Sequence, residues 1–539
     1  MSKGRDEKPP RAPGRRGASV GSRSFTRARQ SRRKQPRRQS AGDSWTFAPP
    51  WRGHRIADLA RAVPVAGWVC ALVAILNAVC WSVITPPFQV PDEPSHFAYV
   101  KQLADTHTLP SSHKFEFSDE EARALIDLHE AALSVLPPTG AISSRVQQAK
   151  LEHDLAKEAQ LPREGSNAAG VATSEPPLYY LLETIPYIVG SHGTLLTRLA
   201  LMRLLSALFA GITAMFVFLF VRETLPATPA ASVASGLSIA FAPLLGFVSG
   251  AVNPDSLLFA IAAALFFFLA RAFRRGLTYR RAITIGAITA AGLLTKLNFV
   301  GLFPGVIVGL AVLALRTARP SRSFAYRAFG LGAGIAISPV VLFAIINLTT
   351  NRPTFGLISS AVSLLSRHGS IFSAISDTWQ LFLPRLPGMK PYEPGIFTTR
   401  QIWFNGFIGQ YGWVETAFPE WVYELAAIFG VAVLGACART LVLLRRTVRE
   451  RLAELVVYVT IGMGLLLLIG GAAYYGPEAE TYTQARYLLP LLALFGAGLG
   501  LATRAAGRRW VPVLGTILVL AMVADDIFSQ LLVIARFYG

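Results

Sequence analysis

Two adjacent carboxylates and a histidine follow the first long apolar segment, in a stretch from Pro86 to Phe97 that carries four prolines. Acidic side chains held at the edge of a membrane are energetically costly, and they mark functional sites by default. Asp92, Glu93 and His96 are therefore candidates for catalysis or ligand binding. The alternative is structural, because Asp is a good helix N-cap and proline suits the first helical position. Two adjacent acids exceed what a cap requires, which favours a functional role.

Further polar residues fall at the ends of apolar segments that we predict to share one side of the membrane. They are Glu175, Tyr179, Arg198, Arg203, Asn253, Asp255, Lys296, Asn298, Trp413, Glu415, Arg486 and Tyr487. Acids and cations lining an outward-facing cavity would suit a lipid phosphate arriving from the bilayer and a hydroxyl acceptor arriving from outside. Each residue also has a structural alternative as a helix cap, a rigid corner or a cation that snorkels to the interface.

The elements that must position these residues are transmembrane helices. The chain of 539 residues is 52% hydrophobic and only 16% charged, against about 25% charged in soluble domains. Long apolar runs recur from about residue 65 to the C-terminus, and they lack the alternation of an outer-membrane barrel. The sequence predicts an all-α polytopic membrane protein with about eleven spans, in a range of about ten to thirteen.

Lys and Arg concentrate in alternate turns, which the positive-inside rule assigns to the cytoplasm. The predicted spans are 65–85, 198–221, 229–250, 255–272, 282–296, 298–316, 328–348, 420–443, 453–474, 486–503 and 511–533. This path places the N-terminus inside, and it places the C-terminus and two long loops, 86–195 and 349–419, outside. The first loop is acidic, with 15 Asp/Glu and 7 Lys/Arg, and its middle predicts amphipathic surface helices over about 117–160. The apolar piece 178–190 is short enough to be re-entrant or interfacial.

The positive charge is concentrated at the N-terminus, where residues 1–62 hold 17 Lys/Arg and 4 Asp/Glu. This composition predicts a disordered cytoplasmic tail preceding a membrane module over 63–535. The tail is typical of a topogenic segment that contacts anionic lipids, with recruitment of a partner or nucleic acid as the alternative; we expect no nucleic-acid partner. Cys70, Cys80 and Cys437 lie in apolar segments and predict packing roles. Asp525 and Asp526, inside the last apolar stretch, receive no assignment.

The order of motifs resembles a bacterial family of predicted membrane proteins of unknown function. It also resembles the GT-C superfamily of membrane glycosyltransferases, in particular the protein O-mannosyltransferases and lipid A aminoarabinose transferases. The motifs are Pro86-Pro87-Phe88 through Pro91-Asp92-Glu93-Pro94-x-His96-Phe97, Pro176-Pro177-Leu178-Tyr179-Tyr180, Asn253-Pro254-Asp255, Thr295-Lys296, Gly409-Gln410-Tyr411-Gly412-Trp413 and Gln484-Ala485-Arg486-Tyr487-Leu488-Leu489-Pro490. Together they cover most of the chain beyond the tail.

The GT-C resemblance implies transfer of a sugar from a polyprenyl-phosphate donor to a hydroxyl of a glycan, lipid or protein acceptor. Asp92 would be the general base, and Glu93 would orient the acceptor or bind a metal. Lys296, Arg486 and, third, Arg203 would stabilise the leaving lipid phosphate. The other expected substrate-binding residues are His96, Glu175, Tyr179, Asn253, Asp255, Trp413 and Tyr487. No cofactor is expected, with a divalent cation as the alternative.

Two other functions are compatible with the sequence. A transporter or flippase for a lipid-linked glycan would use the same cavity and cations without needing a base. The polar groups gather at one face rather than at the midplane where transporter sites usually lie, which favours the enzyme. A non-catalytic assembly protein would depend on the basic tail. In each case the composition favours the plasma membrane of a bacterium, with the site facing outside.

Overall fold

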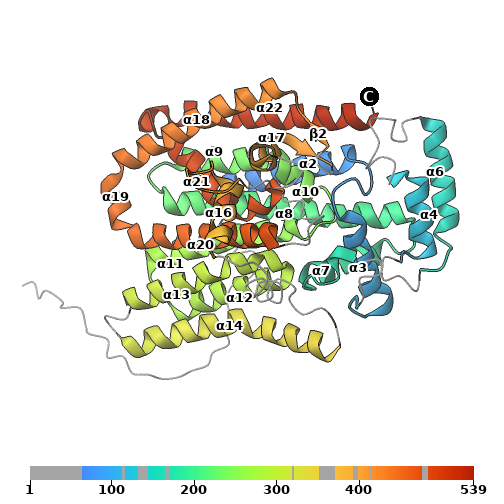
Figure 1. Ribbon diagram of the computed structural model, residues 1–539, viewed down its shortest axis with the longest axis horizontal. Coiled ribbons are helices and arrows are strands. Elements are labelled where there is room, and N and C mark those ends of the chain that lie inside the picture. Colours follow the sequence, from blue (N-terminus) through green and yellow to red (C-terminus); the bar gives the residue numbers. More distant parts are fainter. Residues whose placement is uncertain are drawn as a thin grey trace, which may run out of the picture. The chain divides into compact units, whose positions relative to one another are not determined.

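Helices follow one another through almost all of the described chain in the computed structural model (Figure 1). The structure describes residues 63–111, 116–130, 144–163, 170–317, 321–350, 352, 371–391, 398–412, 415–475 and 484–538. The predicted basic tail, residues 1–62, lies outside the described residues. So do parts of both long loops.

The bounds of the elements follow the apolar runs of the sequence. The first half contains α2 (Val65–Ile84), α3 (Glu93–Thr106), α4 (Asp119–Asp127), α6 (Arg145–Glu158), η1 (Gly170–Ala172), α7 (Leu178–Val189), α8 (Leu195–Thr224), α9 (Pro229–Ala240), α10 (Pro243–Ser249) and α11 (Asp255–Arg275). The middle contains α12 (Tyr279–Thr295), η2 (Leu297–Gly301), α13 (Phe303–Thr317), α14 (Arg322–Thr349) and α16 (Ile371–Phe382). The remainder contains η3 (Gln401–Asn405), α17 (Gly406–Gly409), β1 (Gln410–Tyr411), β2 (Thr416–Ala417), α18 (Glu420–Leu443), α19 (Arg445–Glu450), α20 (Leu452–Tyr475), η4 (Ala485–Leu491), α21 (Leu492–Ala502), η5 (Arg508–Trp510) and α22 (Val511–Tyr538). The predicted all-α class is confirmed, since the described strands form only a two-residue antiparallel pair.

The helical lengths support a multi-pass membrane protein. Among the described residues, eight helices are long and apolar enough to cross a membrane, and nine if the bent pair α9 and α10 is one span. The other two predicted spans fall on α12 and α13, of 17 and 15 residues. These are shorter than the roughly 20 residues that a perpendicular crossing needs. The multi-pass helical architecture is thus confirmed.

The span predicted over 229–250 is broken rather than continuous. Its two helices, α9 and α10, meet at an angle of 53°. Pro243 begins α10, and a proline at this position lacks the backbone donor that would continue α9. The bend brings α10 against α2, where a side chain at Gly246 would collide with the indole of Trp81 at 2.3 Å. The glycine therefore permits the close approach that seats this tryptophan.

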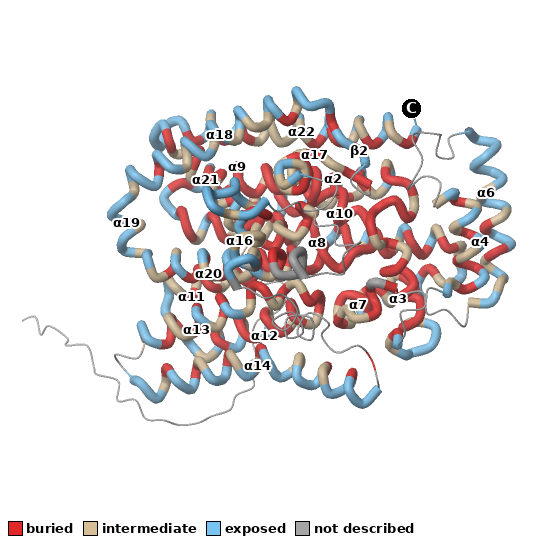
Figure 2. Tube along the Cα trace, in the orientation of Figure 1, coloured by how far each residue is buried: buried red, intermediate tan, exposed pale blue. Residues whose placement is uncertain are grey.

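The core forms around α2, α8, α9 and α11. Figure 2 shows α11 largely buried, whereas α18 and α14 expose much of their surface. The exposed positions of α18 are apolar, including Leu425, Ile428 and Val431. An apolar helix surface without protein contacts is what the hydrocarbon of a bilayer accommodates. Burial therefore separates the protein-packed helices from those with lipid-compatible faces.

The last helix, α22, continues to Tyr538 past the acidic pair that received no assignment. Asp526 is buried and accepts hydrogen bonds from the indole nitrogen of Trp81 at 2.9 Å and from Asn77 at 3.2 Å. Gln530 bonds the second oxygen of Asp526 at 3.0 Å and the Asn77 oxygen at 2.9 Å. The acid thus joins α22 to α2 through polar bonds that a hydrocarbon surrounding strengthens.

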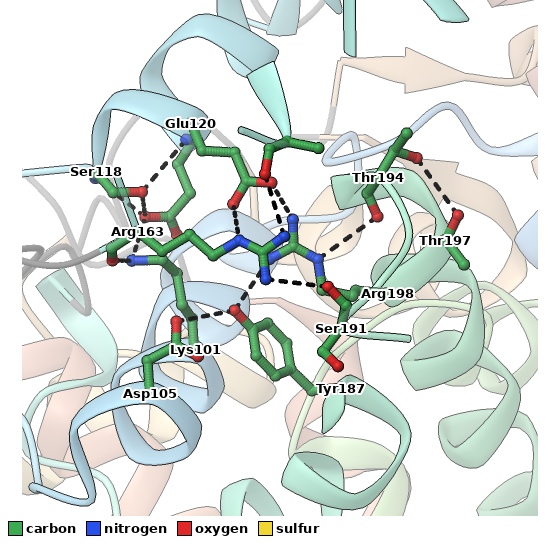
Figure 3. A network of polar contacts seen from close by, with 12 residues as sticks. Lys101, Asp105, Ser118, Glu120, Arg163, Tyr187, Ser191, Thr194, Thr197 and Arg198 are labelled. Carbon is green, nitrogen blue, oxygen red and sulfur yellow. Dashed lines mark hydrogen bonds and ion pairs between the residues drawn. The ribbon is translucent and has the colours of Figure 1, made fainter. Parts of the chain in front are cut away.

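Two helices, α4 and α6, are present where amphipathic surface helices were predicted in the first long loop; α4 buries one face, whereas α6 is exposed along most of its length. A network of charged side chains ties α4 to the membrane module (Figure 3). Glu120 of α4 is buried and pairs with Arg198 of α8 and, at 3.2 Å, with Arg163. Arg198 also donates to the Tyr187 hydroxyl at 3.0 Å, and Lys101 pairs with Glu121 at 3.3 Å. Arg198 is therefore a buried structural residue rather than an anchor at the lipid headgroups.

Replacement of Glu120 by Gln should loosen α4 while the membrane module stays folded. The change keeps the shape of the side chain but removes the charge that two arginines share, and a hydrogen bond to a charged group contributes about 1.5–3 kcal/mol. Amide hydrogen exchange in α4 is expected to quicken by about ten- to a hundredfold. Glu152→Gln, which alters an exposed pair with Gln148 on α6, is the control and should leave exchange unchanged. Equal protection of α4 in both variants would contradict this role.

Candidate functional site

Asp92 stands at the N-terminus of α3 with its backbone in the left-handed region, at φ 70°. This conformation is uncommon for a residue with a side chain, and such strain clusters at functional sites. One carboxylate oxygen of Asp92 accepts a hydrogen bond from Nη2 of Arg486 at 2.6 Å. The other oxygen has no protein partner within the described ranges, and the side chain is 24% exposed. Asp92 is therefore an acid that is fixed on one side and accessible on the other.

Glu93, the next residue, is fully buried and has both oxygens occupied. The side chain of Arg203 donates to its two oxygens at 2.8 and 2.6 Å. The backbone amides of Phe88 and Val252 donate at 2.9 and 3.0 Å. A carboxylate with this many donors has no lone pair left for a substrate. The geometry makes Glu93 a positioning residue, not the acceptor-orienting or metal-binding residue that the resemblance implied.

Arg203 is saturated in the same way, because its remaining donors bond backbone carbonyls in the last turn of α2 and just after it. It donates to Ser82 and Thr85, both at 3.0 Å, and to Pro86 at 3.1 Å. The Glu93–Arg203 clamp, defined as this ion pair with its backbone bonds, therefore fixes the connection that carries Asp92. Arg203 is not available to a lipid phosphate, so two of the three predicted cations remain.

The other two predicted cations, Lys296 and Arg486, lie near the carboxylate of Asp255, the first residue of α11. Nζ of Lys296 lies 2.8 Å from Oδ1 of Asp255, and Nε of Arg486 lies 3.9 Å from Oδ2 of the same residue. Both cations also lie near the ring of Tyr487, at 5.9 and 5.5 Å from its centroid. The Asn253 side chain accepts from the Asp255 amide at 3.0 Å and so shapes the turn into α11. We call Asp92, Asp255, Lys296 and Arg486 the Asp92 site.

Three other predicted binding residues, Glu175, His96 and Tyr179, differ in their position relative to the Asp92 site. Glu175 adjoins it, and its carboxylate accepts from the backbone amide of Leu297 at 3.2 Å. Nδ1 of His96 lies 2.9 Å from the hydroxyl of Tyr180. Tyr179 turns away, since its hydroxyl bonds Ser206 at 2.8 Å within the core. Of the two adjacent tyrosines, Tyr180 is the one that contacts His96, and the sequence offered no signal to choose between them.

The electrostatic environment sets the protonation states of the acids. Burial would raise the pKa of Asp92, but the nearby positive charges of Arg486 and Lys296 outweigh it and hold the pKa below its ordinary value. Burial lowers the pKa of His96 to about 3, so its imidazole is neutral near pH 7. Burial raises the pKa of Glu175, partly offset by Lys296.

A small cavity of about 20 Å³ lies beside Arg486, lined in part by Pro91, Gln410, Gly412 and Gln484. A cavity of this size holds about one water or one hydroxyl group. Gly412 has a positive φ of 64°, which favours glycine. The predicted binding residue that follows it, Trp413, lies outside the described residues. In the ranges that the structure describes, no group of three or more His, Cys, Asp or Glu is placed to hold a metal ion.

Comparison with known proteins identifies a family and two likenesses in structure. A family described as predicted membrane protein (DUF2142) matches residues 75–495. The crystal structure of ArnT from Cupriavidus metallidurans bound to undecaprenyl phosphate is similar, with a TM-score of 0.41, 12% identity, and coverage of 88% of this chain and 76% of that one. The oligosaccharyltransferase of Archaeoglobus fulgidus in the apo form is also similar, with a TM-score of 0.41, 13% identity, and coverage of 87% of this chain and 56% of that one. Among curated proteins, none matches the chain.

Proposed function

The chain belongs to this family of predicted membrane proteins, and from that premise we propose that it is a glycosyltransferase acting at the outer face of the membrane. Its donor would be a polyprenyl-phosphate sugar, and its acceptor a hydroxyl of a glycan, lipid or protein. The observation that carries the proposal is Asp92, an acid with a left-handed backbone of which one oxygen bonds Arg486 and the other has no protein partner in the described chain. Asp255 holds Lys296 in the same group of charges. A base beside cations suits the transfer of a proton away from a hydroxyl and of negative charge onto a phosphate.

The reaction balances with these groups alone. The free oxygen of Asp92 takes the proton of the acceptor hydroxyl while the hydroxyl oxygen bonds to the anomeric carbon. The bond from that carbon to the phosphate oxygen breaks, and its electron pair leaves with the polyprenyl phosphate. Lys296 and Arg486 face the additional negative charge on that phosphate. Positioned cations of this kind typically contribute a few kcal/mol to a transition state.

Arg486 would also link donor binding to the strength of the base. In the structure it bonds Asp92, while its buried Nε has no hydrogen-bond partner in the described chain. A donor phosphate that bonds this nitrogen would share the positive charge. The pKa of Asp92 would then rise from its lowered value toward the operating pH, where a general base is most effective. Asp92 would thus be a weak base in the free protein and a stronger one with donor bound.

The proposal is tested with purified protein in detergent and a synthetic polyprenyl-phosphate sugar. We expect release of polyprenyl phosphate, and a rise in the KM for the donor of about tenfold or more in Arg486→Gln, since a lost charged hydrogen bond costs about 1.5–3 kcal/mol. Arg400→Gln is the control, because Arg400 is exposed in a surface pair with Glu420. A parallel reaction with EDTA decides whether a divalent cation takes part; we expect no effect. An unchanged donor KM in Arg486→Gln would contradict the assigned phosphate contact.

The pH dependence of transfer should be insensitive to His96. In the free protein the carboxylate form of Asp92 is present above its lowered pKa, and it is lost only at a pH below the range in which an ordinary aspartic acid titrates. His96 gains its proton only near pH 3. We therefore expect the rate profile between pH 8 and 5 to keep its shape in His96→Gln. A break in that range that is present in the wild type and absent from the variant would contradict a neutral His96.

A further inference from the structure

A second cavity, of about 900 Å³, lies at the other end of α8 from the Asp92 site. Thr224, the last residue of α8, is in its wall, whereas Arg203 of the clamp lies near the start of the same helix. The helix rises about 30 Å between these two residues, which matches the thickness of the hydrocarbon core of a bilayer. The cavity therefore belongs to the opposite membrane face, the one that the charge pattern predicts to be cytoplasmic.

The body of this cavity is apolar. Its wall includes Phe220, Phe273, Leu455, Met463, Leu494 and Leu501. The part of α20 that lines it, from Glu454 to Leu466, rises about 18 Å. Half of the hydrocarbon core is about 15 Å thick. The apolar wall thus has the depth of one leaflet, which suits acyl chains that enter from that side.

The rim of the cavity is basic, and two of its arginines are already occupied. Arg274 and Arg451 donate to the carbonyl of Thr224 at 2.9 and 2.7 Å. Arg451 also pairs with Glu454 at 2.7 Å. These bonds satisfy the carbonyl end of α8, where cations are favourable. Both residues therefore have a structural role.

Of the other three arginines that line the cavity, Arg316 lies over the ring of Phe273, at 5.8 Å from its centroid. In the part of the chain that the structure describes, neither Arg504 nor Arg508 has an ion-pair or hydrogen-bond partner for its side chain, although both line the cavity. Burial and the positive charge of Arg508 lower the pKa of Arg504. The lining contains five arginines against two glutamates, Glu450 and Glu454. Within the described chain, no ion pair balances the charges of Arg504 and Arg508 beside this apolar wall.

We propose that this cavity, the Arg504 cavity, binds an anionic phospholipid of the predicted cytoplasmic leaflet. The phosphate would lie between Arg504 and Arg508, and the acyl chains would lie against α20 and α21. The negative charge of the headgroup complements the basic rim. The length of the acyl chains in one leaflet matches the depth of the apolar wall. This site is separate from the Asp92 site and does not depend on the proposed transfer reaction.

The test is native mass spectrometry of the full-length protein in detergent, with phosphatidylglycerol and phosphatidylcholine offered in turn. Each basic residue near a headgroup contributes about fivefold to binding. The double variant Arg504→Gln, Arg508→Gln should therefore lose roughly thirtyfold in affinity for phosphatidylglycerol. Arg509→Gln is the control, because this neighbouring exposed arginine does not line the cavity.

A second variant tests the apolar part without changing charge. A Cβ at Gly462 would meet only Leu491 at 3.9 Å, so Gly462→Phe would place its ring in the cavity and should also reduce adduct formation. Thermal unfolding confirms that each variant is folded. Equal binding of phosphatidylcholine, or stabilisation by inorganic phosphate equal to that by phosphatidylglycerol, would overturn the proposal. Adducts unchanged in both folded variants would overturn it as well.

Discussion

Replacing Asp92 by Asn is expected to reduce the rate of sugar transfer by about 10²–10⁴-fold, the usual contribution of a general base. The amide keeps the size of the side chain and can still accept a hydrogen bond from Arg486 through its oxygen. It cannot take a proton from the acceptor. Donor binding should therefore persist while kcat falls, which a comparison of kcat and KM measures directly.

The matched control for this substitution is Asp119→Asn. Asp119 is an exposed carboxylate in the first turn of α4, in the same long loop. Its loss should leave both kcat and thermal stability unchanged. An Asp92→Asn protein that binds donor and transfers sugar at the wild-type rate would remove Asp92 from the reaction.

Breaking the Glu93–Arg203 clamp on one side is expected to destabilise the protein by about 3–5 kcal/mol. The substitution Arg203→Met leaves the Glu93 charge buried without its partner. It also leaves three backbone carbonyls at the end of α2 and just after it without this donor. The free energy of unfolding, measured by denaturant titration in detergent, should fall by this amount.

A double-mutant cycle separates loss of the pair from loss of either side chain. Adding Glu93→Gln to Arg203→Met removes the unpaired charge, so the double variant should be more stable than the sum of the single effects predicts. Arg275→Met, which alters a half-exposed pair with Glu223 at 3.7 Å, should cost at most about 1 kcal/mol. Additive effects at Glu93 and Arg203 would show that the clamp is not a coupled unit.

The apolar runs predicted the helices well because a helix that crosses a membrane requires a long stretch of apolar residues. Helices predicted over 65–85 and 420–443 coincide with α2 and α18 within a residue. The break at Pro243 was missed, since a proline within an apolar run is also tolerated in continuous transmembrane helices. The acid at 526 could not be assigned because its partners, Asn77 and Trp81, are more than four hundred residues distant in the chain.

The candidate site was predicted in outline, but the role of each charge was not. Four motifs contribute Asp92, Asp255, Lys296 and Arg486, and the structure brings these four residues together. The GT-C resemblance favoured Asp92 over Glu93 as the base, but residue type and spacing gave no such preference, because adjacent acids of like chemistry differ only in their three-dimensional partners. The number of donors around Glu93 and the exposed oxygen of Asp92 make that distinction.

The measurement that tests the central claim most directly compares two fates of the donor in proteoliposomes that contain the wild-type protein. One fate is cleavage, seen as free polyprenyl phosphate released together with sugar attached to an acceptor. The other is passage of the intact lipid-linked sugar across the bilayer. The account predicts one polyprenyl phosphate released for each sugar transferred, with the release lost in Asp92→Asn. Movement of intact donor without any release would contradict it and would identify the protein as a flippase.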